Sequence, residues 1–194
     1  GCAARLGIDA FMVKDDSQRF GLKACKVLGA RYAIAKEIQR QLGLDDEELN
    51  FDAITAHSHA LKSLTFVTAT DGNHGRAVAW CAEQFGCKAV VFMPKGTSQF
   101  RLEAIQSHGA RAEITELNYD ETVLFSAQQA KENDWVLLQD SSWEEYKTVP
   151  KHIMQGYLSL VSEFEDQTMT WPTHVLTQAG VGSFAASIFS YFLV

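Results

Sequence analysis

Short apolar runs alternate with longer amphipathic stretches along most of this chain, and this alternation constrains the fold more than any other feature. The runs are rich in Val, Thr, Phe and Ile, which favour strands, and each precedes a turn and a stretch with helical periodicity. The predicted strands are residues 64–70, 89–93, 112–117, 135–140 and 174–178, and the predicted helices between them are residues 73–85, 98–108, 119–132 and 149–163. This order predicts parallel strands joined by right-handed helical crossovers, which is an α/β fold.

Two further helices are predicted ahead of the first strand, over residues 23–42 and 46–61. Gly43 suits the end of the first helix, and the acidic run at 45–48 suits the positive start of the second. Both ends of the chain look incomplete. Residues 1–11 begin inside a helix that leads into a strand, and the apolar helix at 185–194 has no terminating cap. We therefore expect a truncated chain that belongs to a longer protein.

The charge balance and the cysteines bear on partners and location. A formal net charge of −7 without a Lys/Arg cluster argues against a nucleic-acid or membrane-surface partner. No apolar run has membrane-spanning length, and no signal peptide is evident. The cysteines form no CxxC pair and the histidines no HExxH pattern, so we predict reduced thiols in a cytoplasmic protein and no metal site.

Three polar clusters follow predicted strands, where an open parallel sheet binds its ligands. The turn 71–74 follows the first strand, Asp140 closes the fourth, and Gly-Val-Gly at 180–182 follows the fifth. Each cluster also has a purely structural interpretation. The glycine loop could be only a tight turn, Asp140 only a helix or turn cap, and Asn73 only a helix N-cap. His74 is given only a supporting role within its turn. Together, the clusters predict a carboxylate, an amide and a phosphate-type loop on one edge of the sheet.

A lysine at a predicted helix start supplies the remaining chemical group. Lys26 lies among small and apolar neighbours, and both a positive helix end and partial desolvation disfavour an ammonium ion there. A neutral amine is what a Schiff-base lysine needs. Lys23, three residues earlier on the same predicted helical face, is the competing candidate.

Several of these motifs resemble the diaminopropionate ammonia-lyase family, a branch of the tryptophan-synthase-like, fold-type-II pyridoxal-phosphate enzymes. The resemblance covers residues 11–194 and is carried by the stretches 14–30, 70–77, 139–144 and 171–176 and by the loop at 180–182. Gly-Asn-His is shared across the superfamily. The specific parts are Arg-Phe-Gly-Leu at 19–22 and Asp71, because related serine and threonine dehydratases usually carry a serine or similar small group at that position. Cys25 departs from the family, which more often has an aromatic residue there.

The resemblance implies a role for each site residue. Lys26 would be the Schiff-base lysine for pyridoxal 5'-phosphate, and Asn73 the partner of its ring hydroxyl. The turn 71–74 would hold the substrate carboxylate, and both Asp71 and Asp140 would face the substrate amino groups. The remaining residues implied at the site are Gly180, Val181, Gly182 and Ser183 for the phosphate, and Gly72 and His74 in the substrate turn.

The implied reaction is α,β-elimination of 2,3-diaminopropionate to pyruvate and ammonia by a cytoplasmic homodimer. The implied fold is three-layer αβα with parallel sheets. Residues 1–63 and 150–194 would belong to a large cofactor-binding domain, and residues 64–149 would form a smaller αβα domain. Two alternatives stay open at this point: a serine or threonine dehydratase, which Asp71 argues against, and a non-catalytic truncated fragment, which the chain ends favour.

Overall fold

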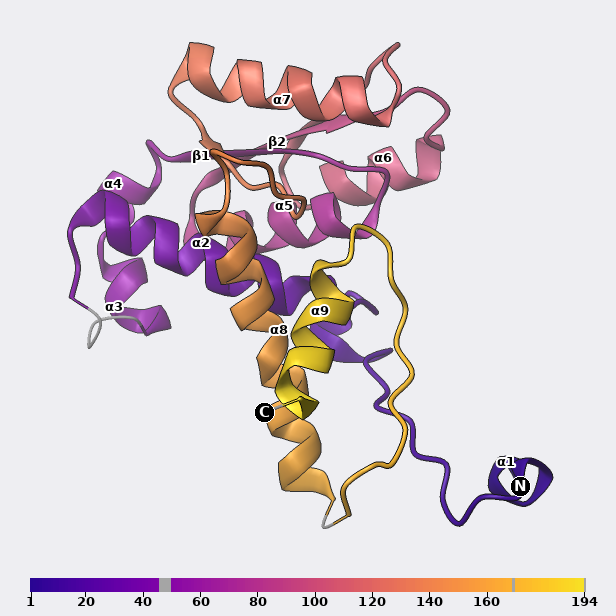
Figure 1. The fold of residues 1–194 in the computed structure, drawn as a ribbon. Coiled ribbons are helices and arrows are strands. Elements are labelled where there is room, and N and C mark those ends of the chain that lie inside the picture. Colours follow the sequence, from indigo (N-terminus) through magenta and orange to yellow (C-terminus); the bar gives the residue numbers. More distant parts are fainter. Residues whose placement is uncertain (46–49, 169, 194) are drawn as a thin grey trace.

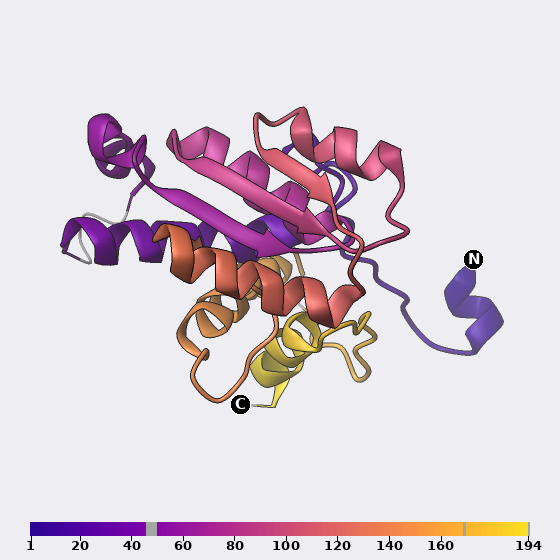
Figure 2. The same cartoon turned by 90° about the horizontal axis from the view of Figure 1, so that it is seen from above.

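The computed structural model describes residues 1–45, 50–168 and 170–193, and within them it has a parallel sheet of four strands (Figures 1 and 2). The strands are β1 (Thr65–Ala69), β2 (Lys88–Met93), β3 (Arg111–Ile114) and β4 (Val136–Leu137), in the order β3-β2-β1-β4. All neighbouring strands are parallel. The prediction of an α/β fold with a parallel sheet is confirmed.

Helices cover both faces of the sheet (Figure 1). One face carries α7 (Tyr119–Asn133), and the other carries α5 (Asn73–Phe85) and α6 (Gln99–Gln106). In β2, Val91 and Met93 belong to the apolar cluster of α5 and α6, whereas Val90 and Phe92 pack with Ala130 of α7. A strand buried on both faces needs such a continuous apolar run, which is why Ala-Val-Val-Phe-Met shows no alternation.

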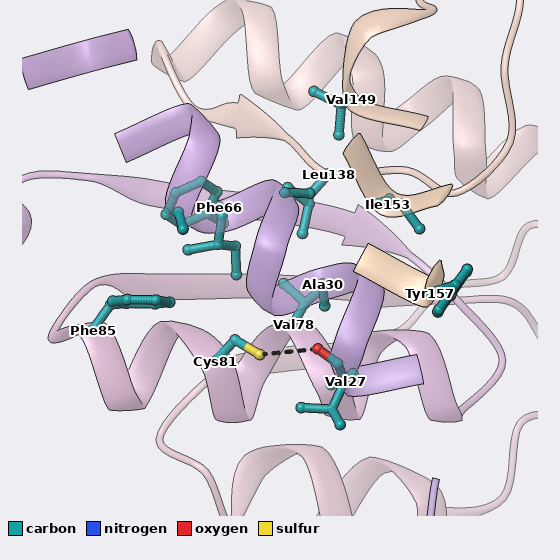
Figure 3. Close-up of a cluster of buried hydrophobic side chains, with 14 of the residues drawn as sticks. Val27, Ala30, Phe66, Val78, Cys81, Phe85, Leu138, Val149, Ile153 and Tyr157 are labelled. Atoms are coloured by element: carbon teal, nitrogen blue, oxygen red, sulfur yellow. Dashed lines mark hydrogen bonds between the residues drawn. The ribbon is translucent and has the colours of Figure 1, made fainter. Parts of the chain in front are cut away.

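Three more helices form the largest apolar cluster together with α5: the first packs on α5, the second on the first, and the third on the second. They are α2 (Lys26–Leu42), α8 (Thr148–Gln167) and α9 (Ser183–Phe192), with α8 between the other two. Figure 3 shows Val27 of α2, Val78 of α5 and Ile153 of α8 pointing into this cluster. Where α2 and α8 cross, Gly29 faces Gly156, and a Cβ added at Gly156 would lie 2.4 Å from the Leu28 carbonyl oxygen. The crossing is close only because both residues lack side chains.

Two of the predicted strands are wrong. Residues 174–178 are irregular in the structure, and so are the residues that follow α1 (Cys2–Leu6). A strand requires a hydrogen-bonded neighbour, and no segment of the described chain pairs with either stretch. Leu176, predicted to be inside a strand, is 88% exposed.

Helix boundaries also differ from the predictions. The predicted helix at 46–61 lies partly outside the described residues; its described part forms α3 (Phe51–Ala56) and α4 (Ser58–Leu61). Asn50 caps α3 by accepting the Ala53 N–H, and His57, with ψ of 32°, separates the two helices. The predicted helix at 185–194 begins two residues earlier, as α9, because the glycine loop leads directly into it. Likewise, α2 begins at Lys26 rather than at residue 23.

Candidate active site

Lys26 is the first residue of α2, and the loop before it separates it clearly from Lys23. That loop contains a 3₁₀ turn (Arg19–Gly21) and two non-glycine residues with left-handed φ, Phe20 at 47° and Lys23 at 55°. Lys23 is therefore exposed and outside the helix, whereas the Lys26 side chain is 26% exposed and points inward. A left-handed φ at two such residues costs free energy that the surrounding contacts must offset. The Phe20 ring stacks near Trp80 with centroids 5.3 Å apart, which is one such contact.

The Lys26 amine and the Asp140 carboxylate form an ion pair. Lys26 Nζ donates to Asp140 Oδ2 over 3.0 Å, and the Asp140 side chain is 7% exposed. His74 also lies near this pair: its Nδ1 is 4.0 Å from the same oxygen, and its Nε2 donates to the Leu138 carbonyl oxygen over 2.8 Å. Burial alone would raise the pKa of Asp140, but the nearby His74 ring and Lys26 ammonium outweigh it and hold that pKa below its ordinary value.

Two tyrosines border this pair. The ring of Tyr157, on α8, lies with its centroid 5.7 Å from Lys26 Nζ, and its hydroxyl is buried without a hydrogen-bond partner in the described residues. Tyr119, the first residue of α7, contacts the Gln139 amide over 3.4 Å. Burial first, and then the carboxylates of Asp140 and Asp71, raise the pKa of Tyr119 to about 12. The turn that begins with Asp71 also carries His74, which lies 4.0 Å from Asp140, so the turn and Asp140 are neighbours.

The turn 71–74 leads from β1 into α5. Gly72 is the N-cap residue of α5, and its N–H donates to Thr70 Oγ1 over 3.0 Å. Asn73 is therefore the first helical residue, with an exposed side chain, and the simpler reading of it as an N-cap is wrong. At Gly75 an added Cβ would lie 2.2 Å from Thr70 Cγ2 and 2.8 Å from Val91 Cγ1. Glycine thus lets the start of α5 pack tightly on the sheet.

The glycine loop at 180–182 leads into α9 and lies near the start of α2. Gly182 is the N-cap residue of α9 with φ of 97°, a left-handed conformation that favours glycine. The Ser183 hydroxyl is buried without a partner in the described chain. Gln178 Nε2 approaches Cys25 Sγ at 4.0 Å, and the Phe184 ring packs on Tyr157 with centroids 5.1 Å apart. The unpaired N–H groups of a helix start therefore lie beside the Lys26 segment.

Two of the three predicted clusters, at Asp71 and Asp140, follow strands of the sheet, whereas the glycine loop follows an irregular segment and not a strand. Three further residues near these clusters were not predicted. Gln139 is fully buried, and its side-chain oxygen accepts hydrogen bonds from Thr68 Oγ1 and the Ala69 N–H, each over 3.1 Å. Tyr119 and Tyr157 were placed in helices without a role. A weak signal existed for Gln139, which immediately precedes Asp140, but none for the tyrosines, whose contacts depend on helix packing.

No group of three or more His, Cys, Asp or Glu side chains in the described ranges could hold a metal ion. Among the helices described, none combines the length and hydropathy needed to cross a membrane. Cys2, Cys25, Cys81 and Cys87 are free thiols.

Comparison with known proteins assigns the class to which this fold and site belong. The model of the pyridoxal-phosphate dependent enzyme family matches residues 1–193, and the chain belongs to that family. It is 49% identical to diaminopropionate ammonia-lyase of Salmonella typhimurium over 97% of this chain and 48% of that protein. The crystal structure of Escherichia coli diaminopropionate ammonia lyase in apo form matches with a TM-score of 0.86 and 46% identity, over 92% of this chain and 49% of that one.

A second structure of the Escherichia coli enzyme, in complex with an aminoacrylate-PLP azomethine reaction intermediate, matches with a TM-score of 0.84 and 45% identity. It covers 92% of this chain and 45% of that chain. The chain thus spans about half the length of the curated relatives it matches. These matches confirm the fold-type-II assignment.

Proposed function

We propose that the complete protein is a pyridoxal-phosphate-dependent ammonia-lyase that converts 2,3-diaminopropionate and water to pyruvate and two molecules of ammonia. The observation that carries the proposal is the Lys26–Asp140 pair, at 3.0 Å, beside the Asp71 turn and the glycine loop. This arrangement occurs in a chain 49% identical to a diaminopropionate ammonia-lyase. We further propose that it acts as a cytoplasmic homodimer, and that residues 64–149 form the smaller of two domains.

The residues present fit the cofactor. The phosphate requires hydrogen-bond donors without other partners, and the start of α9 offers N–H groups together with the unpartnered Ser183 hydroxyl. Added Cβ atoms at Gly180 and Gly182 would meet nothing within 4 Å, so the loop has open space in front of it. Lys26 would bind the aldehyde, and Asn73, exposed at the start of α5, would bind the ring hydroxyl.

When bound, the cofactor supplies an electron sink for the charge that develops at the substrate Cα. The protein supplies the proton transfers and the orientation. Lys26 would take the Cα proton from one face and Asp71 from the other, so that both enantiomers would be substrates. Asp140, kept ionised by His74 and Lys26, attracts a substrate ammonium group. The turn 71–74 holds the substrate carboxylate.

The main alternative is a dehydratase of serine or threonine. Asp71 argues against a dehydratase, because its carboxylate would attract a β-ammonium group, whereas a β-hydroxyl gains little from that charge. The two readings differ in the β-substituent that leaves, and direct competition of diaminopropionate with serine and threonine distinguishes them. Preference for either hydroxy amino acid would overturn the lyase proposal.

The lysine assignment has its own test. After borohydride reduction of the cofactor-loaded protein, peptide mapping should find the pyridoxyl group on Lys26. Lys23 provides the internal comparison, because it is exposed and lies only three residues away. Labelling at Lys23, or at neither lysine, would refute the assignment.

A further inference from the structure

Arg101, on α6, reaches across to the Asp71 turn. Its Nη1 donates to the Asp71 main-chain oxygen over 2.9 Å. The same side chain lies along Gly72, where an added Cβ would be 3.7 Å from both Arg101 Cδ and Nε. The Gly72 N–H in turn donates to Thr70 Oγ1. Two hydrogen bonds, one from Arg101 and one to Thr70, thus hold the single peptide group that joins Asp71 to Gly72.

The choice of acceptor is the informative point. Arginine beside aspartate would ordinarily bind the carboxylate, often through two parallel hydrogen bonds. Here Arg101 binds the carbonyl oxygen, and in the described part of the chain the Asp71 carboxylate has no hydrogen bond or ion pair. A carboxylate tied to arginine is a weaker base and a poorer partner for an ammonium group. The observed contact fixes the Asp71 backbone and leaves its side chain available.

The helix that carries Arg101 is firmly placed. The Ser98 hydroxyl accepts the Arg101 N–H at the start of α6. Ile105, one turn further along α6, is 1% exposed and lies close to Gly75, whose added Cβ would be 3.3 Å from Ile105 Cδ1. Arg101 therefore projects from a helix packed against α5, the helix that the Asp71 turn begins.

We propose that Arg101 is a positioning residue that holds the Asp71–Gly72 main chain so that the unpaired Asp71 carboxylate faces the substrate. The part that concerns substrate rests on the proposed function, in which Asp71 and Lys26 serve opposite enantiomers. Loss of Arg101 should therefore affect one enantiomer of diaminopropionate more than the other. A merely structural role would affect both equally.

The test compares Arg101→Met and Arg101→Lys with a matched control, Arg111→Met, which removes an exposed arginine at the edge strand β3. Hydrogen exchange of the Gly72 amide is measured without substrate, and kcat and KM are measured for each enantiomer. Losing one hydrogen bond changes an equilibrium constant by about threefold to tenfold. Arg101→Met should speed Gly72 exchange by about that factor and lower kcat for one enantiomer about tenfold more than for the other. Arg101→Lys should restore part of the Gly72 protection and part of the lost kcat. Arg111→Met should change neither the exchange rate nor kcat.

Unchanged exchange at Gly72 in Arg101→Met, or an equal loss for both enantiomers, would overturn the positioning role. Failure of the proposed function would give a different combination of results. In that case Arg101→Met still speeds Gly72 exchange, which supports the positioning of the turn, but the unmodified protein converts neither enantiomer.

Discussion

The close crossing of α2 and α8 gives a prediction whose size follows from contact distances. A Cβ at Gly156 would lie 2.4 Å from the Leu28 oxygen, 2.8 Å from Gly29 Cα and 2.9 Å from Tyr32 Cβ. None of these atoms can rotate away, because all belong to the backbone or to a Cβ. Ordinary contact needs ~3.5 Å, so the helices would have to separate by about 1 Å, and such a gap forfeits a quarter to a half of the dispersion energy.

Gly156→Ala should therefore lower the free energy of unfolding by about 2 kcal/mol. Overpacking costs up to ~3 kcal/mol, and the better helix propensity of alanine returns ~1 kcal/mol. For a domain of this size the melting temperature should fall by about 4–8 °C. Because α2 carries Lys26, cofactor affinity should also weaken. Gln155→Ala, one residue earlier on the exposed side of α8, is the control. A melting temperature within about 1 °C of the unmodified protein would show that the crossing is not tightly packed.

Two further predictions concern charge and buried hydroxyls. The Arg19 guanidinium and the Lys14 ammonium hold the pKa of Glu163 at about 2, below its ordinary 4.5. This stabilisation is present above pH 4.5 and is lost as the pH falls toward 2. Glu163→Gln should therefore cost stability at pH 7, by at most ~1 kcal/mol for a partly exposed pair, and little at pH 2. Equal costs in thermal melts at both pH values would contradict the linkage. Tyr157→Phe removes a buried hydroxyl without a partner and should raise the free energy of unfolding by ~1 kcal/mol, whereas Tyr146→Phe should lower it by ~1–3 kcal/mol, since the Tyr146 hydroxyl bonds the Gln139 N–H and the Leu137 oxygen. Denaturant titrations check the pair, and shifts of the same sign would refute the argument.

Topology explains why the strand ends could be predicted from the sequence. Parallel strands end at one edge of a sheet, so Asp71 and Asp140 had to lie near each other once the alternation of strands and helices was recognised. Topology does not place the side chains of Arg101 or Tyr119. Their contacts depend on how far a side chain reaches from a packed helix, which periodicity does not report.

Backbone conformation limited the prediction around Lys26. Left-handed φ values are expected at glycine, and Gly21 has one, but Phe20 and Lys23 share that conformation without any sequence signal for it. Because of this loop conformation, α2 begins at Lys26 and not at residue 23. The later helix start distinguishes the two candidate lysines, because only Lys26 lies on the helix and contacts Asp140.

The short β4 shows how a departure from the predicted strand builds the site. The sequence predicts a strand over 135–140, yet only Val136 and Leu137 pair with β1 as strand residues. Beyond them the Gln139 side chain, rather than a main-chain carbonyl, accepts the Ala69 N–H at the end of β1. The backbone can therefore leave the sheet without leaving that buried donor unpaired. Asp140 is the next residue, and its carboxylate forms the ion pair with Lys26. The Gln139 amide, by replacing a strand hydrogen bond, thus lets the chain leave the sheet where Asp140 can reach the Lys26 amine.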